Sequence, residues 1–261
     1  AGLVSAYTRN LMVTAEAACA LSFEVVRADT DCLNTVALKA RNQGNAVEVA
    51  ERLRDRLKGT EMVSEGRTPD PFSIRCAPAV LGAVWEGVLE VEALVTRELN
   101  GACDNPLVLG AGQVVEGGNF HGAAVAMAMD RLKVMLTEVA AVSERRTFRM
   151  TYGQLSSLPS FLVHGTGTNS GLMLAQYTAA SLVSECKVWS HPASVDSIPL
   201  AQHQEDHVSM GPIAARGAWQ ICQALADVLA IELMCGAQGL DFWLNGEGVD
   251  AEGRKCKIEP L

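Results

Sequence analysis

Several polar segments stand out in a chain that is otherwise rich in alanine, leucine and valine. The most polar is PLAQHQEDHVSMGP, residues 199–212, which holds two histidines and two carboxylates between a pair of prolines. Carboxylates and imidazoles are the groups that proteins use to move protons and to bind cationic or hydrogen-bonding ligands. The other segments are TPDPFSIRC at 68–76, CDNPLV at 103–108 and GGNFHG at 117–122. Each is either a solvated loop or the lining of a pocket.

Local structure alone explains part of each segment. Asn105 precedes Pro106, and an Asx side chain beside a proline forms a turn through hydrogen bonds to its own backbone. Asn119 and Asp206 are each expected to cap the helix that follows, and His207 is expected to be solvated. Only a wider pattern therefore assigns these residues a role in chemistry.

The elements that must position these segments are helices. Apolar residues recur at helical spacing over long stretches, and residues that favour strands are scarce. The pattern predicts helices at about 4–31, 46–58, 77–101, 119–148, 169–189 and 206–238. The polar segments lie at the ends of these helices, where side chains from several rods can converge on one pocket. We therefore expect an all-α fold, with residues 1–261 as a single helical region.

The length of the helices predicts an assembly of more than one chain. A helix of about 20–30 residues is a rod about 30–45 Å long, whose apolar stripe must be covered. In the helix predicted at 77–101, such a stripe is formed by Val80, Val84, Val88, Val91 and Val95. The run SERR at 143–146 is expected to end another helix, because cations favour the negative end of the helix dipole. We expect a long-helix bundle assembled across subunits.

Composition narrows the possible partners and the compartment. The chain of 261 residues is 49% hydrophobic and carries a net charge of -9 without a basic stripe, which argues against nucleic acid and anionic membranes. The most apolar stretch, Ile221 to Leu240, is interrupted by Asp227 and Glu232, and no basic-then-apolar leader opens the chain, so we expect no membrane span. The cysteines lack metal-type spacing and are expected to be reduced core residues. These features predict a soluble, cytoplasmic protein.

The polar segments and their neighbours form an ordered series of motifs. In chain order the series reads FSIRCAPAVLGA, DNPLV, GGNFHG, SERR, LPSFLV, NSGLMLAQYTAA, SHPASVDSIP and QEDHVSMGPIAAR. From about Leu21 to Phe242 the chain resembles the C-terminal half of the histidine ammonia-lyases, which are aromatic amino acid lyases. So many motifs in one order are far more specific than any single motif.

This resemblance implies a mostly helical tetramer whose active sites are each built from several subunits. Such an enzyme removes ammonia from an aromatic amino acid and leaves an α,β-unsaturated acid. Its electrophile is 4-methylideneimidazole-5-one (MIO), which forms from an Ala-Ser-Gly tripeptide in the N-terminal half. This chain has no Ala-Ser-Gly, and its Asn-Ser-Gly at Asn169–Gly171 belongs to another family motif. We therefore expect MIO on a partner chain, a hetero-oligomer or tetramer, and no lyase activity from this chain alone.

The same resemblance assigns candidate substrate-binding residues. Arg75 matches the arginine that binds the substrate carboxylate, for which a planar guanidinium offers two parallel hydrogen bonds; the alternative is a surface ion pair. Phe72 stands where the family has a tyrosine, and Pro69 stands where it has a pocket glutamine, so two hydrogen-bonding side chains are missing. Phe120 matches a pocket aromatic residue or is part of the core, and a pocket role for Asn105 rests on the resemblance only.

Glu205 and its neighbours carry the expectation about the substrate. Glu205 matches the carboxylate that faces the substrate imidazole, which favours histidine over phenylalanine. Gln204 matches the neighbouring pocket amide. His203 stands where the family usually has asparagine, and it introduces a group that titrates near neutral pH. Because Phe72 has no hydroxyl, the catalytic base is either a tyrosine of the partner chain or His203.

The missing tripeptide leaves three accounts open. The chain is a fragment of a longer protein, a natural subunit whose partner supplies the electrophile, or a descendant that kept the fold and lost the chemistry. The subunit is favoured, because a pocket built from several subunits tolerates a break in the chain. In terms of function, the alternatives to an ammonia-lyase are an altered lyase or aminomutase of specialised metabolism, and a non-catalytic scaffold or regulatory paralogue. A partner chain that carries Ala-Ser-Gly distinguishes them.

Overall fold

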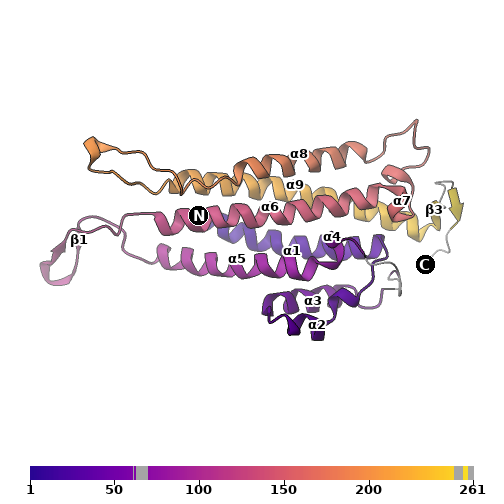
Figure 1. Ribbon diagram of the computed structural model, residues 1–261, viewed down its shortest axis with the longest axis horizontal. Coiled ribbons are helices and arrows are strands. Elements are labelled where there is room, and N and C mark those ends of the chain that lie inside the picture. The colour runs from indigo at the N-terminus through magenta and orange to yellow at the C-terminus, as the bar shows by residue number, and fades with distance from the viewer. Residues whose placement is uncertain (61, 63–69, 250–254, 258–261) are drawn as a thin grey trace.

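The computed structural model describes residues 1–60, 62, 70–249 and 255–257. Long helices run side by side through these residues (Figure 1): α1 (Gly2–Val25), α5 (Ala77–Leu99), α6 (Ala123–Thr151), α8 (Met173–Trp189) and α9 (Gly211–Leu244). The smaller helices α2 (Thr35–Ala40) and α3 (Gly44–Arg56) lie to one side, where α3 packs on α5. The all-α fold predicted from the sequence is confirmed.

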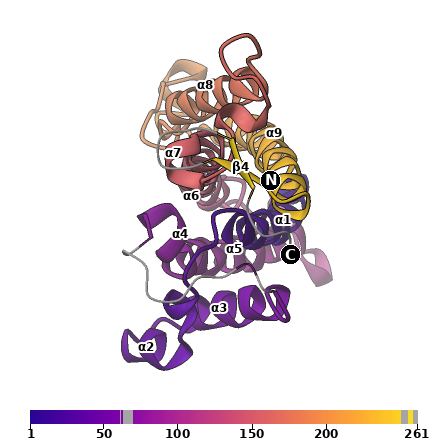
Figure 2. The same ribbon diagram turned by 90° about the vertical axis from the view of Figure 1, so that its right-hand side faces the viewer.

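The helices are stacked in layers, as the view along the bundle shows (Figure 2). α8 covers α6 and α9, which pack on α1 and α5, and α3 forms the far layer against α5. The buried side chains between the layers are mostly leucine, valine, alanine and methionine. Burial of such apolar surface is the main driving force for a bundle of this kind.

The contact between α3 and α5 explains a glycine in α5. Val84, Val88, Val91 and Val95 are buried as the sequence predicted, whereas Val80 is only half-buried. Gly82 lies on the other side of the helix from this valine stripe, and a Cβ there would lie 2.5 Å from the backbone nitrogen of Ala46. Because backbone cannot give way as a flexible side chain can, only glycine allows the two helices to approach this closely.

Two predicted helices begin later than expected, and their predicted caps were wrong. The helix predicted at 119–148 begins at Ala123 after Gly122, and Asn119 does not cap it. The helix predicted at 206–238 begins at Gly211, after Met210 in a left-handed conformation with φ of 54°, so Asp206 is not its cap. Pro212 in its first turn has the φ that a helix needs and lacks only an N–H that would be unpaired there.

Other helix boundaries also differ from those that the local hydrophobic pattern predicted. The helix predicted at 4–31 ends at Val25, and Arg27 follows with a φ of 51°. The helix predicted at 169–189 begins at Met173. The SERR run at 143–146 lies inside α6 and does not end it, because α6 continues to Thr151 and Arg146 is fully buried.

Short elements occupy the two ends of the bundle (Figure 1). We call one end the hairpin end: it holds residues 100–122, with β1 (Leu107–Val108), η2 (Gly110–Gly112) and β2 (Val114–Val115), and residues 190–210, with η4 (Ala201–His203). The opposite end, the α4 end, holds η1 (Asp31–Leu33), α4 (Phe72–Arg75), α7 (Gly153–Ser156), η3 (Ser160–Leu162), β3 (Glu247–Val249) and β4 (Lys255–Lys257). β1 pairs with β2 and β3 with β4, both antiparallel. The hydrophobic pattern predicted none of these strands.

The cysteines are largely core residues, as predicted. Cys19, Cys186, Cys222 and Cys235 are buried without disulfides, and burial raises the pKa of the Cys19 thiol to about 11 and that of Cys235 to about 12. Cys103 is exposed at the hairpin end, so its placement in the core was wrong. Within the described ranges, α9 alone is long and apolar enough to cross a membrane, but half of its apolar window is buried, as in a core helix.

Candidate active site

The first part of the candidate site is α4, a single turn at the start of α5. Pro71 precedes it in an extended conformation, and the side chain of Asp70 accepts a hydrogen bond of 2.8 Å from the backbone N–H of Asp29. Ile74 is fully buried and fixes the turn to the bundle. Phe72 and Arg75 are three residues apart and therefore lie on the same, exposed face of the turn.

Phe72 and Arg75 interact with each other. The guanidinium carbon of Arg75 lies 4.9 Å from the centre of the Phe72 ring, which is a cation–π arrangement. No carboxylate pairs with Arg75 in the part of the chain that the structure describes. The surface ion pair that was the alternative is therefore not found among the described residues. Pro69 lies outside the described residues.

The second part is a tight turn at the hairpin end that carries His203, Gln204 and Glu205. The backbones of Leu200 and Glu205 exchange two hydrogen bonds, of 2.9 and 3.3 Å, and close the turn. Inside it Ala201, Gln202 and His203 have φ values of 46°, 57° and 69°. Left-handed backbone costs a residue with a Cβ about 1–2 kcal/mol. Strain of this kind persists where surroundings over-determine the conformation, and it is frequent at functional sites.

The side chains of this turn are exposed in the single chain. His203, Gln204 and Glu205 are all exposed, and so are Asp206 and His207 after them. The solvated state predicted for His207 agrees with its exposure. A carboxylate, an amide and an imidazole are thus presented together on a constrained loop.

Asn105 and Phe120 lie at the same end on the loop between α5 and α6. The Asn105 side-chain oxygen accepts a hydrogen bond of 2.9 Å from the backbone N–H of Gly117, so this oxygen closes the base of the hairpin loop. Phe120 is 58% exposed and is therefore not part of the core of this chain. The alternative that placed Phe120 in the core does not hold for the single chain.

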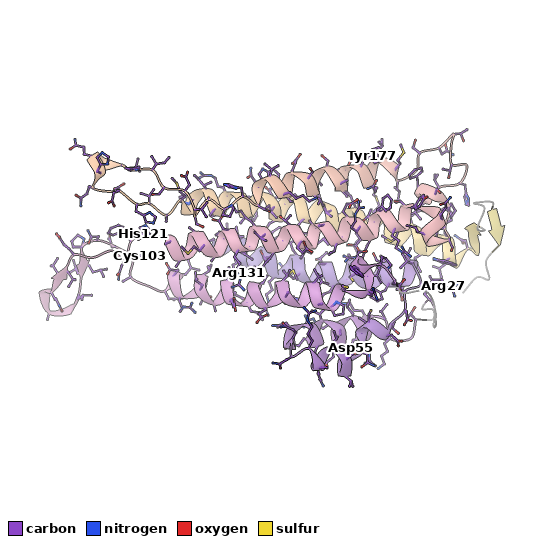
Figure 3. All side chains as sticks on the ribbon, viewed as in Figure 1. Arg27, Asp55, Cys103, His121, Arg131 and Tyr177 are labelled. Carbon is purple, nitrogen blue, oxygen red and sulfur yellow. The ribbon has the colours of Figure 1, made fainter. Side chains whose placement is uncertain are left out.

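A pair of histidines connects the two loops of the hairpin end. The rings of His121 and His207 are nearly parallel, with centroids 5.5 Å apart. His121 follows Phe120 and His207 follows Glu205 by two positions, so the stack joins the segments that carry these two candidates. Figure 3 shows His121 and Cys103 at this end and Arg27 at the other.

The loop that carries Glu205 is also anchored by a buried ion pair on α6. Lys133 and Asp130 lie 2.6 Å apart and are almost completely buried. Asp130 accepts a hydrogen bond of 2.7 Å from the backbone N–H of Ser194, and Lys133 donates one of 2.7 Å to the carbonyl of His191. Burial works against the charge of Asp130, but these partners outweigh it and lower the pKa of Asp130 below 3.8. These hydrogen bonds from a buried ion pair therefore fix the start of the loop to α6.

The two parts of the candidate site lie at opposite ends of the bundle. α5 separates them, and its 23 residues make a rod of about 35 Å. Figure 1 shows α4 at one end of α5 and the β1 hairpin beyond the other. Arg75 and Glu205 of one chain therefore cannot contact the same small ligand. A pocket that contains both must take them from different chains.

Sequence reasoning missed a buried charge network beneath α4. Arg146 and Glu232 are both fully buried and form a two-pronged ion pair between α6 and α9. The signal was available: Glu232 is an acid inside the most apolar stretch of the chain, and an acid is fully buried almost only when it is paired.

A hollow of about 530 Å³ lies beside α2 and α3, lined by residues that include Asp31, Asn34 and Arg54, but it contains none of the predicted site residues. Over the described ranges, no cluster of histidine, cysteine and acidic side chains could hold a metal ion.

Comparison with known proteins agrees with the motif series. The family model for aromatic amino acid lyases matches residues 1–255. Histidine ammonia-lyase of Caldanaerobacter subterraneus subsp. tengcongensis is 43% identical over all of this chain and 53% of its own length. The crystal structure of histidine ammonia-lyase from Trypanosoma cruzi superposes with a TM-score of 0.85 at 43% identity, over 91% of this chain and 45% of that one. Tyrosine aminomutase from Streptomyces globisporus gives a TM-score of 0.87 at 31% identity, over 96% of this chain and 52% of that one.

The chain thus spans about half the length of the relatives that it matches. The match covers the motif series, the long helices and both ends of the bundle. This chain belongs to the aromatic amino acid lyase family.

Proposed function

We propose that this chain is one half of an ammonia-lyase that removes ammonia from an aromatic amino acid, with histidine as the favoured substrate. The observation that carries the proposal is Arg75, an exposed guanidinium stacked on Phe72 with no carboxylate partner among the described residues. A guanidinium in this state is suited to bind the α-carboxylate that every amino acid carries. Relatives described as histidine ammonia-lyases, at 43% identity over the whole chain, support the reaction class.

The residues of this chain perform binding and orientation. Arg75 binds the carboxylate with two parallel hydrogen bonds. Glu205, from another copy of the chain, accepts a hydrogen bond from the imidazole N–H of histidine, and Gln204 offers an amide beside it. Phe120 provides an apolar wall and Asn105 a second amide, whose oxygen is already bonded to Gly117. A carboxylate that faces the ring favours histidine over a substrate with a phenyl ring.

We propose that the site is completed by MIO from a partner chain. The sequence of these 261 residues contains no Ala-Ser-Gly from which the group forms, and the candidate residues of α4 and of the 200–205 turn are exposed in the single chain. When bound, MIO supplies the electrophile that turns the substrate amine into a leaving group. The β-proton then has to be taken by a base, for which we propose a tyrosine of the partner chain or His203. His203 is exposed on the same turn as Glu205.

The single-chain structure supports a pocket shared between copies, and hence a tetramer or hetero-oligomer. α8 buries only Ala179, Val183 and Cys186, while Leu174, Tyr177 and Val188 on its other side are more than half exposed. Figure 3 shows Tyr177 on the side of α8 that faces away from the bundle. An exposed apolar face of this kind is typical of a protein interface. We place the assembly in the cytoplasm, where unpaired cysteines remain reduced.

The experiment that tests the function joins this chain to a chain that carries the Ala-Ser-Gly half of a lyase. We expect the co-purified pair to show the absorbance of MIO and to release an unsaturated acid from histidine. We expect neither from this chain alone. A complete pair that carries MIO and turns over no aromatic amino acid would exclude the proposed function and favour the non-catalytic scaffold.

A second candidate is an aminomutase of specialised metabolism. Phe72 in place of a tyrosine changes the hydroxyls of the pocket, and tyrosine aminomutase from Streptomyces globisporus has the same fold over 96% of this chain. Analysis of the product distinguishes the two, because an aminomutase returns a β-amino acid, whereas a lyase leaves the unsaturated acid and free ammonia.

A further inference from the structure

In the fully buried charge network beneath α4, the Glu232 carboxylate accepts more hydrogen bonds than the carboxylate of an ordinary ion pair does. Arg146 donates to Glu232 through Nε at 2.5 Å and through Nη2 at 2.9 Å. Ser22 of α1 donates to the same carboxylate at 2.6 Å, and Ser143 of α6 at 2.5 Å. Each oxygen of Glu232 therefore accepts two hydrogen bonds, and the network joins α1, α6 and α9.

Stability alone does not explain such a network. Removing two charges from water costs several kcal/mol per ion, and well-packed apolar residues of similar volume often stabilise a core as well or better. Burial on its own would lower the pKa of Arg146, but the attraction of Glu232 and its hydrogen bonds raise this pKa above its ordinary value. Arg146 is therefore permanently charged, with its guanidinium plane fixed by the carboxylate.

The remaining arm of this fixed guanidinium reaches the candidate site. Nη1 of Arg146 donates a hydrogen bond of 3.3 Å to the backbone carbonyl of Ser73. Ser73 lies in α4 between Phe72 and Arg75. The carbonyls in the last turn of a helix have no partner within that helix, and Arg146 supplies one.

We propose that Arg146, oriented by Glu232, is a positioning residue that holds α4 so that Arg75 can bind the substrate carboxylate. The proposal rests on the carboxylate-binding role of Arg75 given above. A helix of one turn is not stable by itself in water, so α4 takes its position from what it contacts. It packs against α1, α5 and α6, and these contacts include the buried Ile74 side chain and the hydrogen bond from Arg146 to the carbonyl of Ser73. Two-pronged binding of a carboxylate tolerates little displacement of the arginine that binds it. The hydrogen bond from Arg146 to the Ser73 carbonyl would limit such displacement of Arg75.

The test compares Arg146→Lys with the matched control Ser143→Ala. Lysine keeps the positive charge beside Glu232 but has no second arm for Ser73. Ser143→Ala removes a donor to the same carboxylate and leaves the contact with α4 intact. The first measurement is backbone hydrogen exchange of the segment 70–76 in the purified protein, and it requires no activity. The second is the KM for histidine together with the inhibition constant of histamine, which has the imidazole but no carboxylate, in the pair with the Ala-Ser-Gly chain.

With Arg146→Lys we expect faster exchange at 70–76 and a KM for histidine raised about tenfold, as for the loss of one charged hydrogen bond, with kcat changed less. Inhibition by histamine should stay the same, because Arg75 does not bind it. Ser143→Ala should change none of these values. If Arg146→Lys does not fold, Glu232→Asp withdraws the carboxylate by one methylene and should shift the same values in the same direction.

Other outcomes overturn the proposal. Unchanged exchange at 70–76, or equal weakening of histidine and histamine, would mean that Arg146 stabilises the core in general and does not position α4. If the complete pair turns over no aromatic amino acid, the proposed function fails separately. The exchange of 70–76 in the two variants then still decides whether Arg146 holds α4.

Discussion

At the scale of single residues, the Phe72 ring supports Arg75 at the position where we expect a tyrosine in the family. The Phe72 ring lies under the guanidinium and holds it by a cation–π contact, for which no hydroxyl is needed. Under the proposed function, Phe72 lacks the hydrogen-bonding group that a tyrosine would give the pocket but keeps the platform of the arginine. We therefore propose that this difference affects binding of the carboxylate and transfer of the β-proton differently.

The first prediction concerns Arg75→Lys. Lysine keeps the charge but loses the planar fork and its stacking on Phe72, so binding of the substrate carboxylate should weaken by about 1.5–3 kcal/mol. Isothermal titration of an amino-acid ligand into the complete complex measures this loss. Arg41→Lys, at an exposed arginine after α2, is the control and should bind as the parent does. Equal affinities for all three proteins would remove Arg75 from the site.

The second prediction concerns the base. If His203 takes the β-proton, turnover depends on its imidazole. His203→Asn restores the residue that the family usually has and should slow turnover. The control is His191→Asn, because the backbone carbonyl of His191, not its imidazole, is what Lys133 contacts. Unaltered turnover would assign the base to a tyrosine of the partner chain.

At the scale of elements, the 190–210 segment shows how a strained loop is held. Its tip has three consecutive left-handed residues, and its root is fixed to α6 through Asp130 and Lys133. The position of Glu205 therefore depends on an ion pair that lies far from it in the sequence. The His121–His207 stack adds a second connection, between this loop and the one that carries Phe120.

The third prediction is the pH dependence of this anchor. Because the folded state lowers the pKa of Asp130 below 3.8, the anchor contributes its full stability above that pH and loses it as the pH falls through the lower value. Asp130→Asn leaves Lys133 buried without its partner and should cost about 3 kcal/mol at pH 7. In strong acid, where Asp130 is protonated, the variant and the parent should unfold at more similar urea concentrations. An equal difference at pH 7 and in strong acid would contradict this account.

The same elements show what the sequence could predict. The valine stripe predicted α5 to within two residues, because periodicity and helix packing are local properties. The start of α9 was wrong by five residues, because the turn before it is set by the Leu200–Glu205 pairing and the Asp130 anchor. SERR was read as a helix end, since nothing local indicates that Arg146 pairs with a residue 86 positions away. The motifs identified the candidate site residues from the sequence. That these residues lie at opposite ends of the bundle could be seen only in the structure.

At the scale of the whole molecule, the separation of the site residues and the exposure of α8 have the same explanation. A chain that presents Arg75 at one end and Glu205 at the other, with the length of α5 between them, can build a pocket only with other copies or partners. We propose that such copies also cover the apolar side of α8. Catalysis and burial of apolar surface would then depend on a single assembly, so a mutation at the interface should affect both.

The last prediction tests this assembly. Light scattering at micromolar concentration should give a mass that is a multiple of 27.7 kDa, because burying the apolar side of α8 against another chain is more favourable than exposing it to water. Val188→Asp places a charge on that side and should shift the population toward smaller particles. Val36→Asp is the matched control: Val36 is 77% exposed, as Val188 is 73% exposed, but it lies on α2, away from α8. A compact, monodisperse particle of a single chain, or equal effects of the two substitutions, would show that α8 is not the contact and that the pocket is not shared through it.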